Sequence, residues 1–298
     1  MPVKATSSIP FISGVGVAVA ALIAVCVTLA FTQEPHPVSG GADRAGIDLS
    51  GYRLEQVYEN DFEHKQKIVF ENDLISSKNG PGSVRVSVPA PDAEWIVEGS
   101  GGVDIKSGEL RASPVPFDSR GLQLLARPRS HLVIWNKHIF PSDFLAAFDM
   151  RPNGSTNGLT IVFFAAAAKG GGDIFDLSLA PRQADYKRYH SGDIANYSDA
   201  YWSRNTEEES ATNRLRKNPG FELVAEGKSR TTGPVDVTHH IRVLKIAGHI
   251  EIEINGHVVL AWDDPGKPLG AGRIGLRSMD GVRMITYDNF KVWAVSKR

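Results

Sequence analysis

Aromatic and charged side chains are concentrated in one segment of the chain. Four of the seven tyrosines lie between Tyr186 and Tyr201, Trp202 follows directly, and Arg, Lys, His and Asp residues are interleaved with them. A sugar ring has an apolar C–H face and equatorial hydroxyl groups, so sugar sites combine aromatic rings with charged or amide hydrogen-bond partners. The segment therefore predicts a saccharide site on a long loop that lies open above a concave sheet. The alternative is that the rings pin this loop to the sheet beneath it.

The chemistry that these residues predict is β-elimination on a uronic acid. Arg, Lys or Asn would neutralise the substrate carboxylate, and a Tyr or His would remove the adjacent proton. The predicted catalytic residues are Tyr189, His190, Tyr197, Arg216 and Lys217. The predicted substrate-binding residues are Trp135, Asp173, Asp176, Arg182, Tyr186, Tyr201, Trp202, Arg204 and Asn218.

Hydrolysis ranks below elimination, because it requires two carboxylates at a fixed distance across the sugar. Asp173 and Asp176 are three residues apart and fall on opposite faces of a regular strand. Glu251 and Glu253 share a face, but they alternate with isoleucines in a hairpin, where surface carboxylates are the ordinary outcome.

No cofactor and no catalytic transition metal are expected, because the nine histidines form no H-x-x-x-H pair and no His–carboxylate motif. A structural calcium ion between the first and last strands is the weaker alternative. Its oxygen ligands would be Glu59, Asp61 and Asp288. The alternative is that these three residues are solvent-exposed acids at strand ends and bind no ion.

The composition is typical of a globular protein with a sizeable core, since 42% of the 298 residues are hydrophobic. The 33 Lys and Arg residues balance 34 Asp and Glu residues, which argues against a nucleic-acid binder. The single cysteine, Cys26, precedes the body of the protein, so no disulfide and no Cys-ligated zinc are expected there. The oligomeric state does not follow from the sequence.

The N-terminus carries an export or anchoring signal. Residues 11–31 form 21 positions without a charge, and as a helix they would extend about 32 Å, the thickness of a hydrocarbon core. We assign residues 1–32 to a signal-anchor or signal peptide and residues 33–50 to a linker. The body is expected to be anchored in the membrane through residues 11–31 and to face the extracytoplasmic side, or to be secreted or periplasmic after cleavage.

Period-two patterns dominate the rest of the chain. In residues 249–254 isoleucines alternate with polar residues, Asn255-Gly256 is the preferred pair of a type I′ turn, and residues 257–262 return as the second strand. Helical periodicity is almost absent, and 206–217 offers a short surface helix at most. Further strands are predicted at 54–62, 95–97, 103–105, 110–112, 131–135, 144–150, 159–166, 174–179, 220–225, 237–247, 273–279 and 282–295.

These patterns predict an all-β, two-sheet antiparallel jelly-roll sandwich over residues 51–298. Three closing segments, EIEINGHVVLAW, GRIGLR and YDNFKVW, resemble the last strands of the concanavalin A-like lectin/glucanase superfamily. HLVIWNKHIFPSDF, the stretch from GLTIVFFAAAAKGGG to SDAYW, and TNRLRKNPGFELVAEG resemble the YesU-like family of that superfamily. The resemblance covers about Gly51 to Trp293. It implies a role in the breakdown of pectin-type and other acidic polysaccharides, and it assigns no catalytic residue.

The sequence as a whole predicts an exported jelly-roll protein that acts on an acidic polysaccharide or oligosaccharide, by β-elimination. Three alternatives remain open: a carbohydrate-binding module without turnover, a glycoside hydrolase, and a cell-surface interaction domain. Its expected partners are a carbohydrate ligand or substrate and the membrane.

Overall fold

The computed structural model describes residues 47–64, 66–70, 93–113, 131–154, 158–204, 212–228, 231, 236–279, 282 and 284–298. The predicted membrane segment 11–31, Cys26 and the predicted cleavage region lie outside this part of the chain. Among the described residues no helix has both the length and the apolar character needed to cross a membrane.

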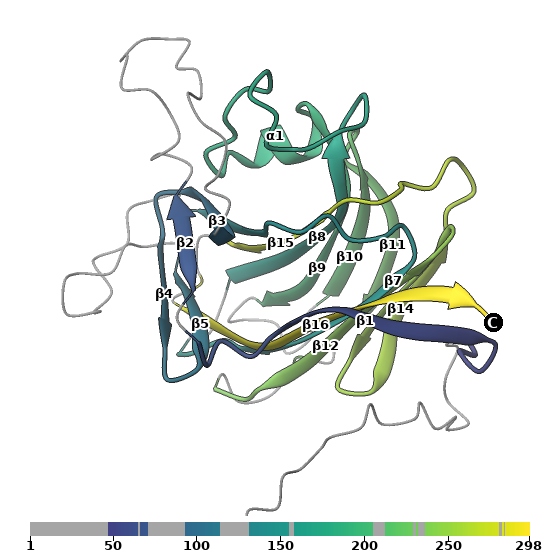
Figure 1. The fold of residues 1–298 in the computed structure, drawn as a ribbon, viewed down its shortest axis with the longest axis horizontal. Coiled ribbons are helices and arrows are strands. Elements are labelled where there is room, and N and C mark those ends of the chain that lie inside the picture. The colour runs from purple at the N-terminus through teal and green to yellow at the C-terminus, as the bar shows by residue number, and fades with distance from the viewer. Residues whose placement is uncertain are drawn as a thin grey trace, which may run out of the picture. The chain divides into compact units, whose positions relative to one another are not determined.

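Strands make up almost all of the regular structure (Figure 1). The first half of the chain contains β1 (Tyr52–Asn60), β2 (Lys67–Phe70), β3 (Ala93–Gly99), β4 (Gly102–Lys106), β5 (Glu109–Ser113), β6 (Leu132–Asn136), β7 (Phe144–Arg151) and β8 (Gly158–Ala168). The second half contains α1 (Tyr186–His190), β9 (Ile194–Arg204), β10 (Thr212–Asn218), β11 (Glu222–Lys228), β12 (His239–Ile246), β13 (His249–Ile254), β14 (His257–Asp263), β15 (Arg273–Ser278) and β16 (Ile285–Lys297).

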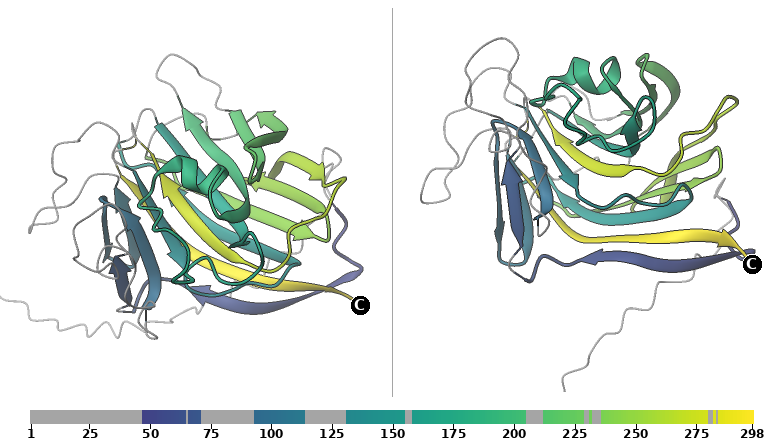
Figure 2. Two further views of the ribbon diagram at one scale, coloured as in Figure 1. Left: turned by 90° about the horizontal axis from the view of Figure 1, so that it is seen from above. Right: turned by 45° about the horizontal axis from the view of Figure 1, so that its top comes forward.

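The strands form two sheets that pack face to face (Figures 1 and 2). The back sheet has the order β14-β13-β12-β7-β16-β5-β4, with β1 paired to β16. The front sheet has the order β11-β10-β9-β8-β15-β6-β3-β2. Among the described strands, every pairing is antiparallel except that of β2 with β3, which is parallel. The predicted all-β antiparallel sandwich is confirmed.

The predicted hairpin is present with its expected turn. β13 and β14 pair from His249 with Asp263 to Ile254 with His257. Asn255 and Gly256 have φ angles of 52° and 79°, the two positive values that a type I′ turn requires. Local sequence chemistry therefore determined this part of the back sheet.

Two local predictions are wrong. The segment 174–179, expected as a strand, forms turns, and Asp173 and Asp176 accept hydrogen bonds from the backbone N–H groups of Phe175 and Ser178. Residues 212–217, expected as the end of a short helix, belong to strand β10, because pairing with β9 and β11 outweighs a weak helical pattern.

Three apolar clusters of the described residues hold the sandwich together. The largest lies between the two sheets and includes Trp95, Phe148, Tyr201 and Trp202. A second lies on the outer face of the front sheet, where residues of the segment 174–194, including α1, cover the strands (Figure 2). The third, on the outer face of the back sheet, packs Leu145 and Leu244 against residues near the start of the described chain.

Candidate functional site

Strand alternation divides the predicted site residues between two faces of the front sheet. Neighbouring residues of a strand point to opposite faces, so Arg216 and Asn218 lie on one face of β10 and Leu215 and Lys217 on the other. The register pairs Arg216 with Ser198 and Lys217 with Tyr197. The residues therefore do not form the single constellation that their proximity in sequence predicted.

Three of the predicted rings point into the core between the sheets. Tyr197, Tyr201 and Trp202 are fully buried there. The hydroxyl of Tyr201 lies 3.2 Å from that of Tyr287. Because Tyr201 is fully buried, neither its ring nor its hydroxyl is presented to a polymer. The same burial raises the pKa of Tyr201 well above its usual value.

Tyr197 and Lys217 meet at one carboxylate on this inner side. The Tyr197 hydroxyl donates to Asp264 at 2.5 Å, and Lys217 Nζ lies 2.6 Å from the same oxygen. Burial, together with the bond to Asp264, raises the pKa of Tyr197 beyond the range in which it acts as a base near neutrality. These two predicted catalytic residues fasten the β14–β15 connection to the front sheet.

Trp135 and Tyr189 lie on the outer face but are covered. The rings of Trp135 and Phe163 stack at 5.6 Å, and those of Phe163 and Tyr189 at 5.3 Å. All three side chains are buried. The expectation of an open, ring-rich loop is therefore wrong here, because these rings attach the segment that contains α1 to the sheet.

Tyr189 also belongs to a buried charged group. Its hydroxyl donates to Glu98, whose two oxygens also accept from Nε and Nη2 of Arg182. Arg182 in turn donates to the carbonyl of Ile174 at 2.8 Å. Burial, ahead of the nearby Glu98 charge, raises the pKa of Tyr189 well above its usual value, so Tyr189 is a hydrogen-bond donor in the fold.

The remaining predicted residues lie apart from these groups. Both oxygens of Asp173 accept from Arg273, at 2.8 and 2.5 Å. Asp176 is exposed and accepts from the hydroxyl of Ser178. Arg204 is the last residue of β9, and its side chain lies outside the described part of the chain.

Four accessible side chains converge on the outer face, and we call them the outer-face cluster: Tyr186, His190, Arg216 and Phe221. The His190 ring lies 4.9 Å from that of Tyr186 and 4.3 Å from that of Phe221. Arg216 Cζ lies 3.9 Å from the centre of the Phe221 ring. Rings and a guanidinium from three separate segments thus form one surface, with Phe221 37% exposed.

The backbone beneath this cluster is tightly held. Gly220 N donates to the carbonyl of His190, which joins the β10–β11 turn to the end of α1. Asn218 Nδ2 donates to Asn196 Oδ1 and Ser198 Oγ, and Asn196 donates to the carbonyl of Tyr189. Phe221 has a φ of 57°, a left-handed conformation that is strained for a bulky residue.

The surroundings of His190 disfavour its protonated form. Burial lowers its pKa, the Arg216 and Lys187 charges act in the same direction, and Asp185 opposes them. Its Nδ1 lies 2.7 Å from the hydroxyl of Ser191. A neutral imidazole exchanges hydrogen bonds with hydroxyl groups and accepts a proton, so the cluster combines apolar rings, one cation and one weak base.

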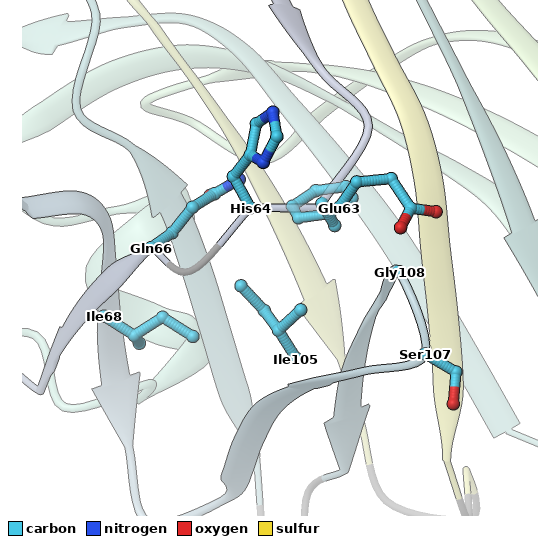
Figure 3. Close-up of a pocket in the computed structure, with 8 residues that line it drawn as sticks. Glu63, His64, Gln66, Ile68, Ile105, Ser107 and Gly108 are labelled. Atoms are coloured by element: carbon cyan, nitrogen blue, oxygen red, sulfur yellow. The ribbon is translucent and has the colours of Figure 1, made fainter.

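A pocket of about 370 Å³ opens elsewhere, where the edges of the two sheets meet (Figure 3). Its apolar side chains are Phe62, Ile68 and Ile105, and its other lining residues are Glu63, His64, Gln66, Ser107 and Gly108. None of the eight is Arg, Lys, Tyr or Trp, and Phe62 is buried. The described lining of this pocket therefore supplies neither an exposed stacking ring nor a permanent cation for an acidic sugar.

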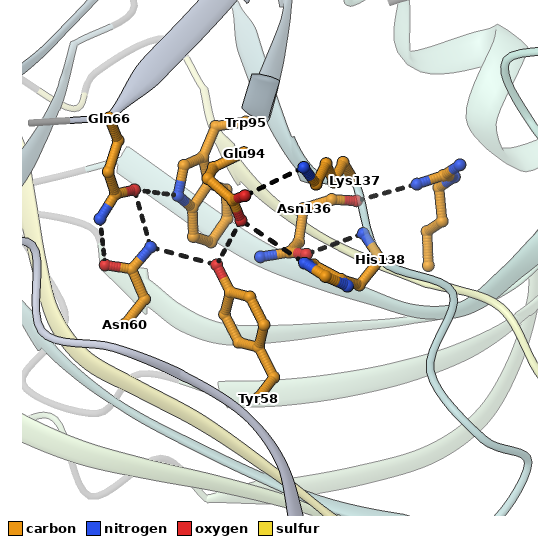
Figure 4. A network of polar contacts seen from close by, with 9 residues as sticks. Tyr58, Asn60, Gln66, Glu94, Trp95, Asn136, Lys137 and His138 are labelled. Carbon is orange, nitrogen blue, oxygen red and sulfur yellow. Dashed lines mark hydrogen bonds and ion pairs between the residues drawn. The ribbon is translucent and has the colours of Figure 1, made fainter. Parts of the chain in front are cut away.

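A polar network lies beside this pocket (Figure 4). Gln66 Oε1 accepts from Asn60 Nδ2 and from the indole of Trp95. Glu94 forms ion pairs with Lys137 at 3.0 Å and His138 at 3.5 Å. Burial raises the pKa of Tyr58 in this network to about 12. Its charges satisfy one another, so it fastens β1, β3 and β6 together.

The residues predicted to bind calcium are not assembled into a cage. Glu59 is paired with Lys291 at 2.8 Å, Asp61 accepts from the backbone of Glu63, and Asp288 accepts from that of Asn289. Among the described residues, no three His, Cys, Asp or Glu side chains are grouped as a metal site would require.

Comparison with known proteins assigns this chain to a family. The model of a family described as "Domain of unknown function (DUF1961)" matches residues 84–292. The chain is also 33% identical over 213 residues to the uncharacterized protein YesU of Bacillus subtilis strain 168, covering 69% of this chain and 91% of that one. The chain belongs to the DUF1961 family. The predicted YesU-like resemblance is thereby confirmed.

A solved structure supports the same fold for this DUF1961 member. It is a protein of unknown function with a galectin-like fold from Bacillus subtilis, with a TM-score of 0.65 and 29% identity. The match covers 83% of this chain and all of that one. A carbohydrate-binding module, CBM66, from Bacillus subtilis has a TM-score of 0.42 at 14% identity, over 66% of this chain and 93% of that one, and this likeness concerns the fold alone.

Sequence reasoning missed two residues at the site of this DUF1961 protein. Phe221 follows Asn218-Pro219-Gly220, which indicated only a turn. Arg277 lies with Arg273 on the outer side of β15, whereas Ile274 and Leu276 point into the core. The alternation of arginine with isoleucine and leucine in this strand is the signal from which Arg277 was predictable.

Proposed function

We propose that the outer-face cluster binds an acidic polysaccharide or oligosaccharide. The single observation that carries this proposal is the convergence of the exposed Phe221 ring with the partly exposed Tyr186 and His190 rings, with Arg216 Cζ 3.9 Å from the Phe221 ring. Aromatic faces contact the C–H face of a sugar, and a guanidinium pairs with a carboxylate. The galectin-like fold of the similar structure supports a carbohydrate ligand, but a fold alone does not specify a function.

Binding is tested with an array of neutral and acidic glycans, followed by calorimetry on the glycans retained. The proposal expects saturable binding of a uronic-acid oligosaccharide by the wild type. Phe221→Ala should weaken it, whereas Val57→Ala, at an exposed apolar residue of β1, should not. Equal affinity of the wild type and Phe221→Ala would show that the ligand binds elsewhere. Absence of glycan binding would favour an interaction domain.

A second candidate function is β-elimination at the same cluster. It is favoured by His190, because the other two predicted bases, Tyr189 and Tyr197, are buried. The lowered pKa of His190 favours the unprotonated imidazole, which can accept a proton. In this reaction Arg216 would neutralise the substrate carboxylate while His190 removes the proton at C5, and the bond from C4 to the glycosidic oxygen breaks as the C4–C5 double bond forms. The protonated imidazole would then return its proton to the leaving oxygen. Unsaturated products that absorb in the ultraviolet, lost in His190→Ala, would establish elimination. Reducing ends without that absorbance would indicate hydrolysis, and binding without products would indicate a module.

We also propose that the protein acts outside the membrane, anchored through residues 11–31 or released after cleavage. The uncharged stretch of 21 residues supports this location. Protease added to intact cells should digest the body of the protein, and N-terminal sequencing would distinguish the anchored form from the cleaved one. Complete protection until lysis would contradict export.

A further inference from the structure

Arg277 is a buried guanidinium with incomplete hydrogen bonding. It extends from β15 on the outer face of the front sheet and is fully buried. Its Nη2 donates to the carbonyl of Ala184 at 2.9 Å, whereas Nε and Nη1 have no hydrogen-bond partner. Buried polar groups are normally paired, so each exception requires an explanation.

The charges around Arg277 do not balance. The buried carboxylate of Glu98 is occupied by Arg182, through Nε and Nη2, and by the hydroxyl of Tyr189. Two buried arginines therefore share one buried carboxylate. Because a guanidinium stays protonated even in protein interiors, the second positive charge has no buried counter-ion of its own among the described residues. Asp185 also acts on Arg277, but it is exposed and lies 4.0 Å from Arg188.

Arg277 lies directly beneath the outer-face cluster. Its Cζ is 4.9 Å from the centre of the Tyr186 ring and 5.2 Å from that of Tyr189. Tyr189 is buried, but Tyr186 is partly exposed and packs against His190 and Phe221. The Tyr186 ring is thus the cover between the unpaired guanidinium and the surface where the saccharide is proposed to bind.

We propose that Arg277 recognises the carboxylate of the saccharide bound at the outer-face cluster, and that Tyr186 moves aside to admit it. This inference rests on the proposed function and adds Arg277 as a second cation for the uronic-acid carboxylate, in addition to Arg216. A carboxylate supplies the missing negative charge and an acceptor oxygen for one of the two unpaired nitrogens, because Nε–H and Nη1 point to opposite sides of the guanidinium. A neutral sugar hydroxyl supplies no charge, and it leaves the burial cost of the guanidinium uncompensated.

The inference is tested by comparing acidic trisaccharides with their carboxyl-reduced counterparts, which are neutral but otherwise identical. Galacturonate and glucuronate trimers are the probes. The wild type should bind the acidic form at least about tenfold more tightly, as expected for one charge-assisted hydrogen-bonded pair. Arg277→Met should reduce this preference at least about fivefold, with the remainder due to Arg216, while keeping the affinity for the neutral form within about twofold. Arg214→Met, at an exposed arginine of β10 paired with Glu226, should retain the preference.

The outcomes separate this inference from the proposed function. If Arg277→Met keeps the wild-type preference, or if the wild type does not distinguish the two forms, the carboxylate assignment is overturned while saccharide binding stands. If the wild type binds neither form, the proposed function fails, and the inference fails with it. If free acetate alone shifts the melting temperature as much as the acidic trimer does, the site binds anions without recognising a saccharide.

A measurement on the wild-type protein covers the case in which Arg277→Met does not fold. A buried Nε–H exchanges slowly with solvent and is visible by NMR, and Arg277→Lys assigns its signal. The acidic trimer should shift this Nε–H signal, and the carboxyl-reduced trimer should shift it far less. An unmoved signal at saturating acidic trimer would refute the contact.

Discussion

Trp135 lies against the backbone of Gly275, where a Cβ atom would come within 2.4 Å of Cε3 of the indole ring. The two residues are paired across β6 and β15, and Gly275 is also paired with Phe163 in β8. The absence of a side chain at Gly275 lets the indole lie flat on the sheet and stack with Phe163 at 5.6 Å. The stacking of Trp135 on Phe163, beneath the proposed site, thus depends on one glycine.

Gly275→Ala should therefore destabilise the fold. The added methyl group forces the fully buried indole to move, and such overpacking costs about 1–3 kcal/mol in the free energy of unfolding. Chemical denaturation measures this loss. Gly270→Ala is the matched control, because a Cβ at Gly270 meets nothing within 4 Å. Equal stability of the two variants would contradict the packing described for Trp135.

Asp199 should make stability fall as the pH rises. This carboxyl is fully buried, its Oδ1 has no partner, and burial raises its pKa from 3.8 to about 7 against a weak opposing bond from Asn213. Because the folded-state pKa lies above the unfolded value, the stabilisation is complete below about pH 4 and is lost as the pH rises through about 7. The free energy of unfolding should fall by up to about 4 kcal/mol over this window.

Asp199→Asn tests this dependence. The variant keeps the shape of the side chain without its ionisable group, so its free energy of unfolding should depend less on pH. At pH 8 this free energy should exceed that of the wild type by about 2 kcal/mol. Asp193→Asn, at an exposed carboxylate just before β9, should leave the wild-type dependence unchanged. A wild-type curve that is flat between pH 4 and pH 8 would contradict the buried, unpaired carboxyl.

Arg216 and Phe221 should contribute to binding with little effect on folding. Phe221→Ala removes the stacked ring, and its loss should reduce the affinity for an acidic oligosaccharide about tenfold, as expected for a desolvated cation–π and stacking contact. Arg216→Lys keeps the charge but loses the planar guanidinium, so we expect a comparable reduction. Calorimetry gives both affinities, and thermal unfolding checks that the melting temperatures match that of the wild type.

Lys217, unlike its neighbour Arg216, should contribute to the stability of the fold and not to saccharide binding. Its Nζ pairs with the nearly buried Asp264 and donates to the carbonyl of Lys267 at 3.0 Å. Lys217→Met leaves Asp264 without its cation and should lower the free energy of unfolding by about 2 kcal/mol at pH 7. The affinity of the folded variant for saccharide should be unchanged. Loss of binding without loss of stability would mean that Lys217 faces the ligand after all.

The sequence by itself determined the local elements. Alternating isoleucines and Asn255-Gly256 fixed the β13–β14 hairpin, because side-chain alternation and turn chemistry act between residues close in the chain. The same patterns predicted most strands and the family resemblance. They also marked the segment from Tyr186 to Trp202 as unusual, and Tyr186 and His190 from it do belong to the accessible cluster.

Only the tertiary structure decided which of those side chains reach the surface. Tyr189 is covered and Tyr197 faces the inner core, although both were predicted as bases, because burial depends on the sheet register and on the segment that packs above the sheet. Phe221, from the β10–β11 turn, and Arg277, from β15, join Tyr186 of α1 from segments far apart in sequence. Their convergence follows from long-range strand pairing, which short-range patterns do not encode.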